Sequence, residues 1–196
     1  MLLIRKASEE DWQIIQDICT ETWLSTYQEI YSSQYIQRVF EIFYSQERLV
    51  KDLTELSPEW NGYWLAETDD QALGCIGGGM GEDGRANIYV LYVLPRAQRL
   101  GVGHALVRTL TDYQKSEHQA VEQAVTVTEG NTLGISFYEK KALALKMLLK
   151  IGLIVVRPGI YTISEIFKNK KEHLCKLLSV AVKLLNLTQI RFIKLF

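Results

Sequence analysis

The chain has 196 residues, 47% of them hydrophobic, which favours one domain with an ample core and leaves room for an appendage. Its three cysteines are odd in number and lack metal-binding spacing, so no metal site is expected and a reducing cytoplasm is the simplest location. The net charge of −1 conceals an asymmetry: residues 1–141 hold twelve basic and twenty-one acidic residues, net −9, whereas residues 142–196 hold ten basic and two acidic, net +8.

We expect neither a signal peptide nor a membrane span in this chain. Its N-terminal sequence becomes polar after four residues, which argues against a signal peptide. The longest apolar tract, residues 142–156, is interrupted by Lys146 and Lys150 and is too short to cross a bilayer.

The first quarter of the chain predicts one strand followed by helices. Leu2–Arg5 is expected to be a short strand, and Ser8 followed by Asp11 is typical of a capping box. Two stretches with helical spacing follow, and residues 48–56 are expected to continue helically before Pro58. Their apolar positions are Trp12, Ile15, Ile18, Cys19 and Trp23, then Tyr35, Ile36, Val39, Phe40 and Phe43.

Residues 62–93 predict three strands joined by tight turns. Gly77-Gly78-Gly79 is a second candidate for a phosphate loop, but no helix follows it, so glycines of a strand or bulge are the preferred interpretation. The expected strands are Gly62–Glu67, Leu73–Gly79 and Ala86–Val93, with turns at Asp69-Asp70 and Asp83-Gly84.

A glycine turn joins the third strand to a helix. Pro95 ends the strand, because proline has no N–H for a ladder, and apolar residues at helical spacing begin at Val102. The first turn of a helix has unpaired N–H groups at the positive end of its dipole, and glycine lets a phosphate approach the backbone. The pattern therefore indicates a phosphate-bearing ligand at residues 98–103, with a tight packing turn as the alternative.

A dinucleotide-binding site is the less favoured interpretation of this turn. The motif G-x-G-x-x-G/A requires glycine or alanine where this chain has Leu106. It also requires an acidic residue at the end of the next strand, whereas Glu122 is expected before that strand.

The pattern Val93-x-Pro95-x-x-Gln98-x-x-Gly101-x-Gly103-x-x-Leu106 resembles the acetyl-CoA motif of the GNAT superfamily of N-acetyltransferases. The resemblance implies an α/β fold with a mixed, mainly antiparallel sheet flanked by helices, and acetyl-CoA as co-substrate. Arg99 and Leu100 replace the family's frequent Gly and Lys, which should not abolish binding because backbone N–H groups make the contacts. The turn would wrap the pyrophosphate, and the preceding strand would hold the pantetheine and thioester. The implied residues are Leu91, Tyr92, Val93, Gln98, Arg99, Leu100, Gly101, Val102 and Gly103.

A second motif follows the next expected strand, residues 121–128, and lies in an expected short helix over residues 133–141. The stretch from Asn131 to Lys140 resembles the family's N-x-x-A-x-x-F-Y-E-K, with Gly134 in place of alanine. Asn131 and Tyr138 are two helical turns apart and share a face. The resemblance implies that both meet the pantetheine arm and that Tyr138 protonates the departing thiolate. A phenol, with an ordinary pKa of about 10, keeps its proton at pH 7; a core tyrosine is the alternative.

The resemblance also implies an acceptor site lined by an aromatic segment. Trp23, Tyr27 and Tyr31 occupy the place where several GNAT members line the acceptor pocket, with ordinary aromatic packing as the alternative. The acidic body favours a cationic amine, although a solvated acidic surface explains the charge as well.

No general base is evident from the sequence. Asn87 stands where some relatives have a glutamate near the start of the central strand. The substitutes, acting through water, are Glu67, Glu82 and Asp83.

The resemblance ends at residue 141. Residues 151–157 and 160–164 predict a hairpin that would supply the family's last two strands, and residues 165–187 have helical spacing. We expect an acetyltransferase domain over residues 1–164 and a basic, amphipathic helical tail over 165–196, through which the chain could form a homodimer. The abrupt change of composition also fits an altered end, such as a shifted reading frame or a spliced terminus.

The expected function is acetyl transfer from acetyl-CoA to a primary amine of a small molecule, protein or peptide. The alternative is a non-catalytic CoA-binding module or partner-binding protein of the same fold, which Asn87 and the altered C-terminal third both permit. Nucleic acid is not expected as a partner. The weaker alternative is that the basic tail binds nucleic acid or an acidic partner.

Overall fold

The computed structural model describes residues 1–69, 71–128, 130–149, 152–156 and 160–166, with side chains as far as residue 140. Contacts divide the chain into two compact units, Met1–Val125 and Thr126–Phe196, and each is described by itself. Residues 167–196, on which the predicted tail and homodimer depend, lie outside the described residues, so the boundary expected at residue 164 stays a prediction.

The first unit opens with a strand followed by helices, as the sequence predicts, but it has three helices where two were expected. The capping box at Ser8 is confirmed, because the Ser8 N–H donates to the Asp11 carboxylate at 2.7 Å. Ser45 interrupts the helical stretch that was expected to continue: its hydroxyl accepts from the Arg48 N–H at 3.4 Å and starts a separate helix. The elements are β1 (Leu3–Lys6), α1 (Trp12–Tyr27), α2 (Ser33–Phe43) and α3 (Gln46–Thr54).

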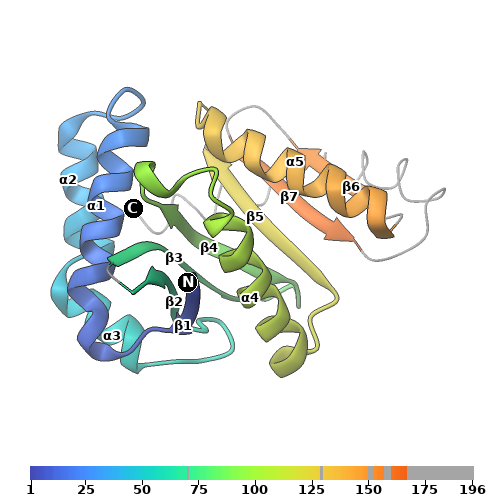
Figure 1. The fold of residues 1–196 in the computed structure, drawn as a ribbon, viewed down its shortest axis with the longest axis horizontal. Coiled ribbons are helices and arrows are strands. Elements are labelled where there is room, and N and C mark those ends of the chain that lie inside the picture. Colours follow the sequence, from blue (N-terminus) through green and yellow to red (C-terminus); the bar gives the residue numbers. More distant parts are fainter. Residues whose placement is uncertain (70, 129, 150–151, 157–159, 167–196) are drawn as a thin grey trace. The chain divides into compact units, whose positions relative to one another are not determined.

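A mainly antiparallel sheet forms the centre of the first unit (Figure 1). Strands β1 to β4 pair in antiparallel order along the sequence, and β4 pairs with β5 in parallel. Helices α1–α3 lie on one side of the sheet and α4 on the other (Figure 1). This arrangement confirms the predicted fold class. The remaining elements are β2 (Tyr63–Thr68), β3 (Gln71–Met80), β4 (Ala86–Val93), α4 (Val102–His118) and β5 (Glu122–Thr128).

The glycines of β3 allow close backbone approach. A Cβ on Gly78 would overlap the carbonyl oxygen of Asn87, and one on Gly79 would overlap that of Glu59. The register with β4 shifts between Gly77 and Gly78, which marks a bulge. The strand interpretation of these glycines is therefore confirmed, and a phosphate loop at this position is excluded.

A buried amide network fixes α4 against the strands. Gln114 is fully buried, and its Nε2 donates to Asn61 Oδ1 and to the Asn87 carbonyl oxygen, each at 3.2 Å. Its Oε1 accepts from Gln123 Nε2 at 2.8 Å, and Gln123 Oε1 accepts from Thr111 Oγ1 at 2.8 Å. One side chain of α4 thereby connects β4, β5 and the segment before β2.

The second unit contains α5 and a hairpin. Helix α5 (Thr132–Leu149) is longer than the predicted short helix, because Ala, Leu, Lys and Met favour helix and no glycine or proline ends it earlier. Strands β6 (Gly152–Val156) and β7 (Ile160–Ile166) pair in antiparallel fashion, which confirms the predicted hairpin. The helix expected from Glu165 is wrong at its start, because Glu165 and Ile166 belong to β7.

Candidate functional site

The turn before α4 has the backbone conformation of an anion-binding loop. Arg99 and Gly101 both have positive φ, 64° and 85°, and Leu100 lies between them. In a backbone of this kind, the N–H groups of successive residues point toward one concave side of the turn. The Ala105 N–H donates to the Gly101 carbonyl at 3.0 Å as the first turn of the helix begins, so by helix geometry the N–H groups of Val102 and Gly103 have no acceptor within α4. The structure thus places Gln98–Gly103 as the sequence predicts, at the positive end of a 17-residue helix.

The end of β4 leads directly into this turn. In the first unit β4 pairs with β5 over three residues, from Ala86 to Ile88, and its remaining residues pair with β3. Tyr89 is the additional residue at the bulge, because Gly77 pairs with Val90 and Gly78 with Ile88. Leu91, Tyr92 and Val93 therefore have main-chain groups on the β5 side that no strand of the first unit pairs with.

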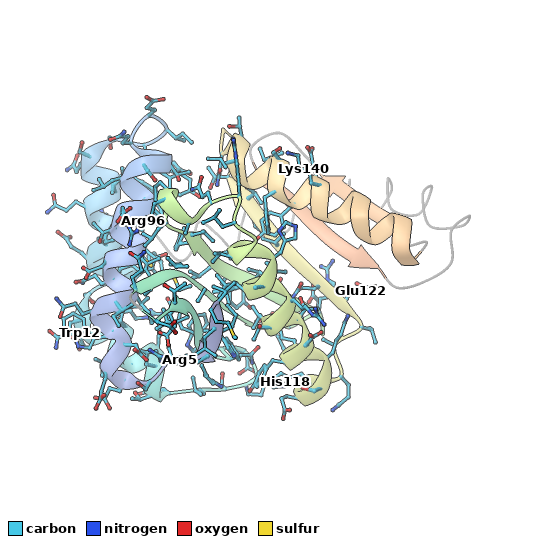
Figure 2. All side chains as sticks on the ribbon, viewed as in Figure 1. Arg5, Trp12, Arg96, His118, Glu122 and Lys140 are labelled. Carbon is cyan, nitrogen blue, oxygen red and sulfur yellow. The ribbon has the colours of Figure 1, made fainter. Side chains whose placement is uncertain are left out.

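Two side chains hold the turn in place. Gln98 Nε2 donates to the Val93 carbonyl at 3.3 Å and ties the turn to the end of β4. Arg96, labelled in Figure 2, donates to both carboxylate oxygens of Glu21 at 3.2 Å and so connects the turn with α1. Both partners of this ion pair are about half exposed, so it guides the position of the turn more than it stabilises the fold.

The three predicted acceptor residues form one aromatic run. The ring centroids of Trp23 and Tyr27 are 4.5 Å apart, those of Tyr27 and Tyr31 5.9 Å, and those of Tyr31 and Tyr35 4.6 Å. Trp23 and Tyr27 are buried, whereas Tyr31 and Tyr35 are partly exposed. Partial burial raises the pKa of Tyr35, so its phenol is neutral at physiological pH. The run connects α1 to α2 and offers π faces, which attract cations.

Two of the carboxylates considered as bases are held by arginines. Glu67 Oε1 accepts from Arg5 Nε at 2.9 Å, and Asp83 Oδ2 accepts from Arg85 Nε at 2.8 Å. Hydrogen bonds from Arg85 hold the pKa of Asp83 below its ordinary value against the opposing effect of burial. Asn87 Nδ2 donates to the Arg85 carbonyl at 3.1 Å, and an amide takes up no proton at neutral pH. These contacts make Glu67, Asp83 and Asn87 poor general bases.

The second motif residues lie in the second unit. Asn131 caps α5, because its Oδ1 accepts from the Gly134 N–H at 2.9 Å. A Cβ on Gly134 would lie 2.9 Å from Asn131 Nδ2 and 3.1 Å from Val127 Cγ1, which explains glycine at this position. Tyr138 lies two turns further along α5, with its ring centroid 5.0 Å from that of Phe137. The roles of Asn131 and Tyr138 toward a ligand stay predictions.

Sequence reasoning missed a hydrogen-bonded group around the side chain of Tyr92. Tyr92 was singled out with the main chain of its strand, yet its Oη accepts from Trp23 Nε1 at 2.7 Å and lies 3.1 Å from Tyr44 Oη. Tyr44 was not singled out. Its partner is 48 residues away, and no local pattern signals such a contact.

The described part of the chain holds neither a metal-binding cluster nor a membrane-spanning helix. No group of three or more His, Cys, Asp or Glu side chains there is arranged to hold a metal ion. Among the same residues, no helix has both the length and the apolar character needed to cross a membrane.

Comparison with known proteins agrees with this geometry. The model of a family described as the acetyltransferase (GNAT) family matches residues 15–142. Spermidine N(1)-acetyltransferase of Thermoplasma acidophilum is 28% identical over 138 residues, which are 70% of this chain and 84% of that protein.

Solved structures share the fold. The PaiA N-acetyltransferase of Thermoplasma acidophilum, crystallised in complex with coenzyme A, matches 84% of this chain and 98% of its own, with a TM-score of 0.70 and 23% identity. The ribosomal-protein-S18-alanine N-acetyltransferase of Escherichia coli matches 88% of this chain and 98% of its own, with a TM-score of 0.55 and 14% identity.

Proposed function

Because the chain belongs to the GNAT acetyltransferase family, we propose that it acetylates a primary amine of a small cationic molecule. Family membership indicates that the acetyl donor is acetyl-CoA and that the reaction is an acyl transfer. The observation that carries the proposal is the turn with two left-handed residues between β4 and α4. A helix start with an open glycine turn fits a pyrophosphate better than it fits mere packing, because no side chain fills the space beside Gly101.

The donor site is proposed to use backbone more than side chains. The N–H groups of residues 98–103 would hold the pyrophosphate, and the main chain of Leu91, Tyr92 and Val93 would hold the pantetheine and thioester. An N–H near Val93 would then polarise the thioester carbonyl, as an oxyanion hole does. The unpaired side of β4 supports this assignment.

The reaction is direct attack of the amine on the thioester. The amine nitrogen bonds to the acetyl carbon and releases one of its two N–H protons, the carbon–sulfur bond breaks, and the CoA thiolate takes a proton, for which Tyr138 is the proposed donor. The amine must lose a proton first, since a lysine-type amine has a pKa of about 10.4. The arginines on Glu67 and Asp83 leave Glu82, acting through water, as the candidate that takes that proton.

Three observations support a small cationic acceptor rather than a protein or peptide. Residues 1–141 carry a net charge of −9, which attracts cations. Trp23, Tyr27 and Tyr31 form a run of aromatic rings whose outer member, Tyr31, is partly exposed, and the π faces of such rings attract ammonium groups. The curated relative that is 28% identical acetylates spermidine, according to its name.

An amine panel tests the proposal. Acetyl-CoA turnover would be measured with spermidine, spermine, a mono-amine such as n-butylamine, and a lysine-containing peptide. The expected order of kcat/KM places the polyamines above the mono-amine and the peptide. Binding of acetyl-CoA without turnover on any amine would favour the non-catalytic alternative, and a preference for the peptide would overturn the small-molecule assignment.

A further inference from the structure

The side chain of Tyr92 lies on the face of the sheet that carries α1. Tyr92 is paired with Cys75 of β3, and directly paired residues of antiparallel strands point to the same face. Cys75 is fully buried, and its thiol is a hydrogen-bonding neighbour of the Cys19 thiol on α1. The Tyr92 ring is therefore placed where the aromatic run begins, while its main chain belongs to the segment assigned to the thioester.

Two groups hold the Tyr92 hydroxyl. Trp23 Nε1, on α1, lies 2.7 Å from Tyr92 Oη, and Tyr44 Oη lies 3.1 Å from it. Tyr44 follows the last residue of α2, is 6% exposed, and is itself fixed by Gln16, whose Nε2 donates to the Tyr44 carbonyl at 2.7 Å. Helix α1 thus holds Tyr92 directly through Trp23 and indirectly through Tyr44.

The group holds three hydrogens, one on the Trp23 indole and one on each phenol, but only two hydrogen bonds join its members. An indole N–H only donates, so it occupies one lone pair of Tyr92 Oη, and the two phenols share a single hydrogen between them. One hydroxyl hydrogen remains, and among the side chains that the structure describes no acceptor takes it. Burial raises the pKa of both Tyr44 and Tyr92 well above the ordinary value, so both keep their hydrogens at neutral pH.

We infer that Tyr44 is a positioning residue for the amine acceptor. Acting through Tyr92, and together with Trp23, it gives the Tyr92 ring and the remaining hydroxyl donor one fixed place beside the reacting segment of β4. The inference rests on the proposed function, which assigns the thioester to this segment and the acceptor to the aromatic run. Removing the Tyr44 hydroxyl loosens Tyr92 and weakens acceptor binding, whereas the pyrophosphate turn at residues 98–103 is unaffected.

Steady-state kinetics of Tyr44→Phe test the inference, with acetyl-CoA and spermidine, or the best amine of the panel, as substrates. The KM for the amine is expected to rise about three- to tenfold, the effect of one net hydrogen bond, while the KM for acetyl-CoA and the melting temperature stay at wild-type values. Tyr63→Phe is the matched control, because Tyr63 is 2% exposed on β2 and its hydroxyl takes no part in the group. Neither KM should change in it.

A double-mutant cycle of Tyr44→Phe and Tyr92→Phe tests whether Tyr44 acts through Tyr92 or independently of it. Because Tyr44 acts through Tyr92, the double variant should show the same amine KM as Tyr92→Phe alone. Additive effects would overturn the inference, and so would a wild-type amine KM in Tyr44→Phe. Equal rises of both KM values with a lower melting temperature would assign Tyr44 a structural role instead.

Three further outcomes keep the test decisive. If Tyr44→Phe does not fold, Trp23→Phe removes the other hydrogen bond to Tyr92 and should raise the amine KM in the same way; a wild-type value there overturns the inference. If the wild-type protein acetylates no amine of the panel, the proposed function fails and the inference falls with it. If the wild type turns over the amine and both variants match it, the inference alone fails.

Discussion

Trp23 on α1 and Tyr92 on β4 are 69 residues apart in the sequence, and the indole Nε1–H donates to the phenol Oη at 2.7 Å. The bond joins the aromatic run proposed for the acceptor to the strand proposed for the thioester. The proposed sites for the amine acceptor and for the thioester are thereby joined by a hydrogen bond within the first unit. A substitution in α1 is expected to weaken binding of the amine acceptor more than binding of the CoA pyrophosphate, which is proposed to lie at residues 98–103.

Gly101→Ala is expected to weaken CoA binding through the backbone alone. At a φ of 85° an alanine is strained by about 1–3 kcal/mol. Its Cβ has no neighbour within 4 Å, so no clash contributes. We expect the turn to relieve the strain by changing φ, which points its N–H groups away from the ligand. Calorimetric titration with CoA should show roughly a five- to hundredfold loss of affinity in a folded variant.

Arg99→Gly is the matched variant for that measurement. Glycine adopts the φ of 64° found at this residue without strain, so the turn keeps its shape and the guanidinium alone is lost. We expect a smaller, salt-dependent loss of CoA affinity. Wild-type affinity in Gly101→Ala would contradict the pyrophosphate site.

Tyr138→Phe is expected to slow the chemical step. The ring contact with Phe137 is kept, while the proton for the departing thiolate is removed, so kcat should fall by up to ~10²–10⁴ with nearly unchanged KM for acetyl-CoA. Tyr89→Phe, at a half-exposed tyrosine, serves as the control and should retain wild-type kcat. Full activity in Tyr138→Phe would return Tyr138 to a packing role.

Local patterns predicted the parts of the fold that local chemistry determines. The strand from Ala86 to Val93 has the predicted bounds, and Gly84, with φ 77°, makes the hairpin turn before it. Leu149 ends α5 eight residues later than predicted, because the sequence after Lys141 contains strong helix formers.

The side-chain networks were beyond prediction for a physical reason. Gln114 and Asn61 are 53 residues apart, and their hydrogen bond forms only once α4 has packed on the sheet. Neither residue belongs to a spacing pattern, since a buried amide looks the same in sequence as an exposed one. The same holds for Tyr44 and Tyr92, whose partners are set by the tertiary fold.

Asp11→Asn is expected to remove a pH-dependent part of the stability. Asp11 accepts from Arg5 Nη1 and Nη2 at 2.7 and 2.8 Å, and mainly these bonds lower its pKa to about 2. Because the folded pKa lies below the unfolded value of about 3.9, the contribution is present above pH 4 and is lost as the pH falls toward 2. Its size is about 2 kcal/mol at pH 7 before allowance for the partly exposed Arg5.

Urea unfolding at pH 7 and at pH 2.5 measures this effect. The wild type and Asp11→Asn should differ by about 1–2 kcal/mol at pH 7 and by much less at pH 2.5. Asp69→Asn, at an exposed carboxylate paired with the N-terminus, is the control and should change stability little. An equal difference at both pH values would contradict the role given to ionised Asp11.

Truncation after Ile166 tests the predicted tail. Residues 167–196 hold seven basic residues and one acidic residue, and the predicted homodimer depends on them. The truncated chain retains residues 15–142, which match the family model, and should keep acetyl transfer. Light scattering should find a dimer for the full chain and a monomer after truncation; a full chain that is monomeric would contradict the homodimer.

Gln114→Leu is expected to destabilise the first unit more than any other change in the amide network. The leucine removes two donors and an acceptor at once, and leaves Asn61 Oδ1, the Asn87 carbonyl and Gln123 Nε2 buried without these partners. Each such group costs about 1–3 kcal/mol, so a loss of roughly 3 kcal/mol or more in the free energy of unfolding is expected. Thr111→Val, at the outer end of the network, removes one hydroxyl and should cost only about 1 kcal/mol. Urea unfolding at pH 7 gives both values, and a Gln114→Leu protein as stable as Thr111→Val would show that the network is not the connection between α4, β4 and β5 described above.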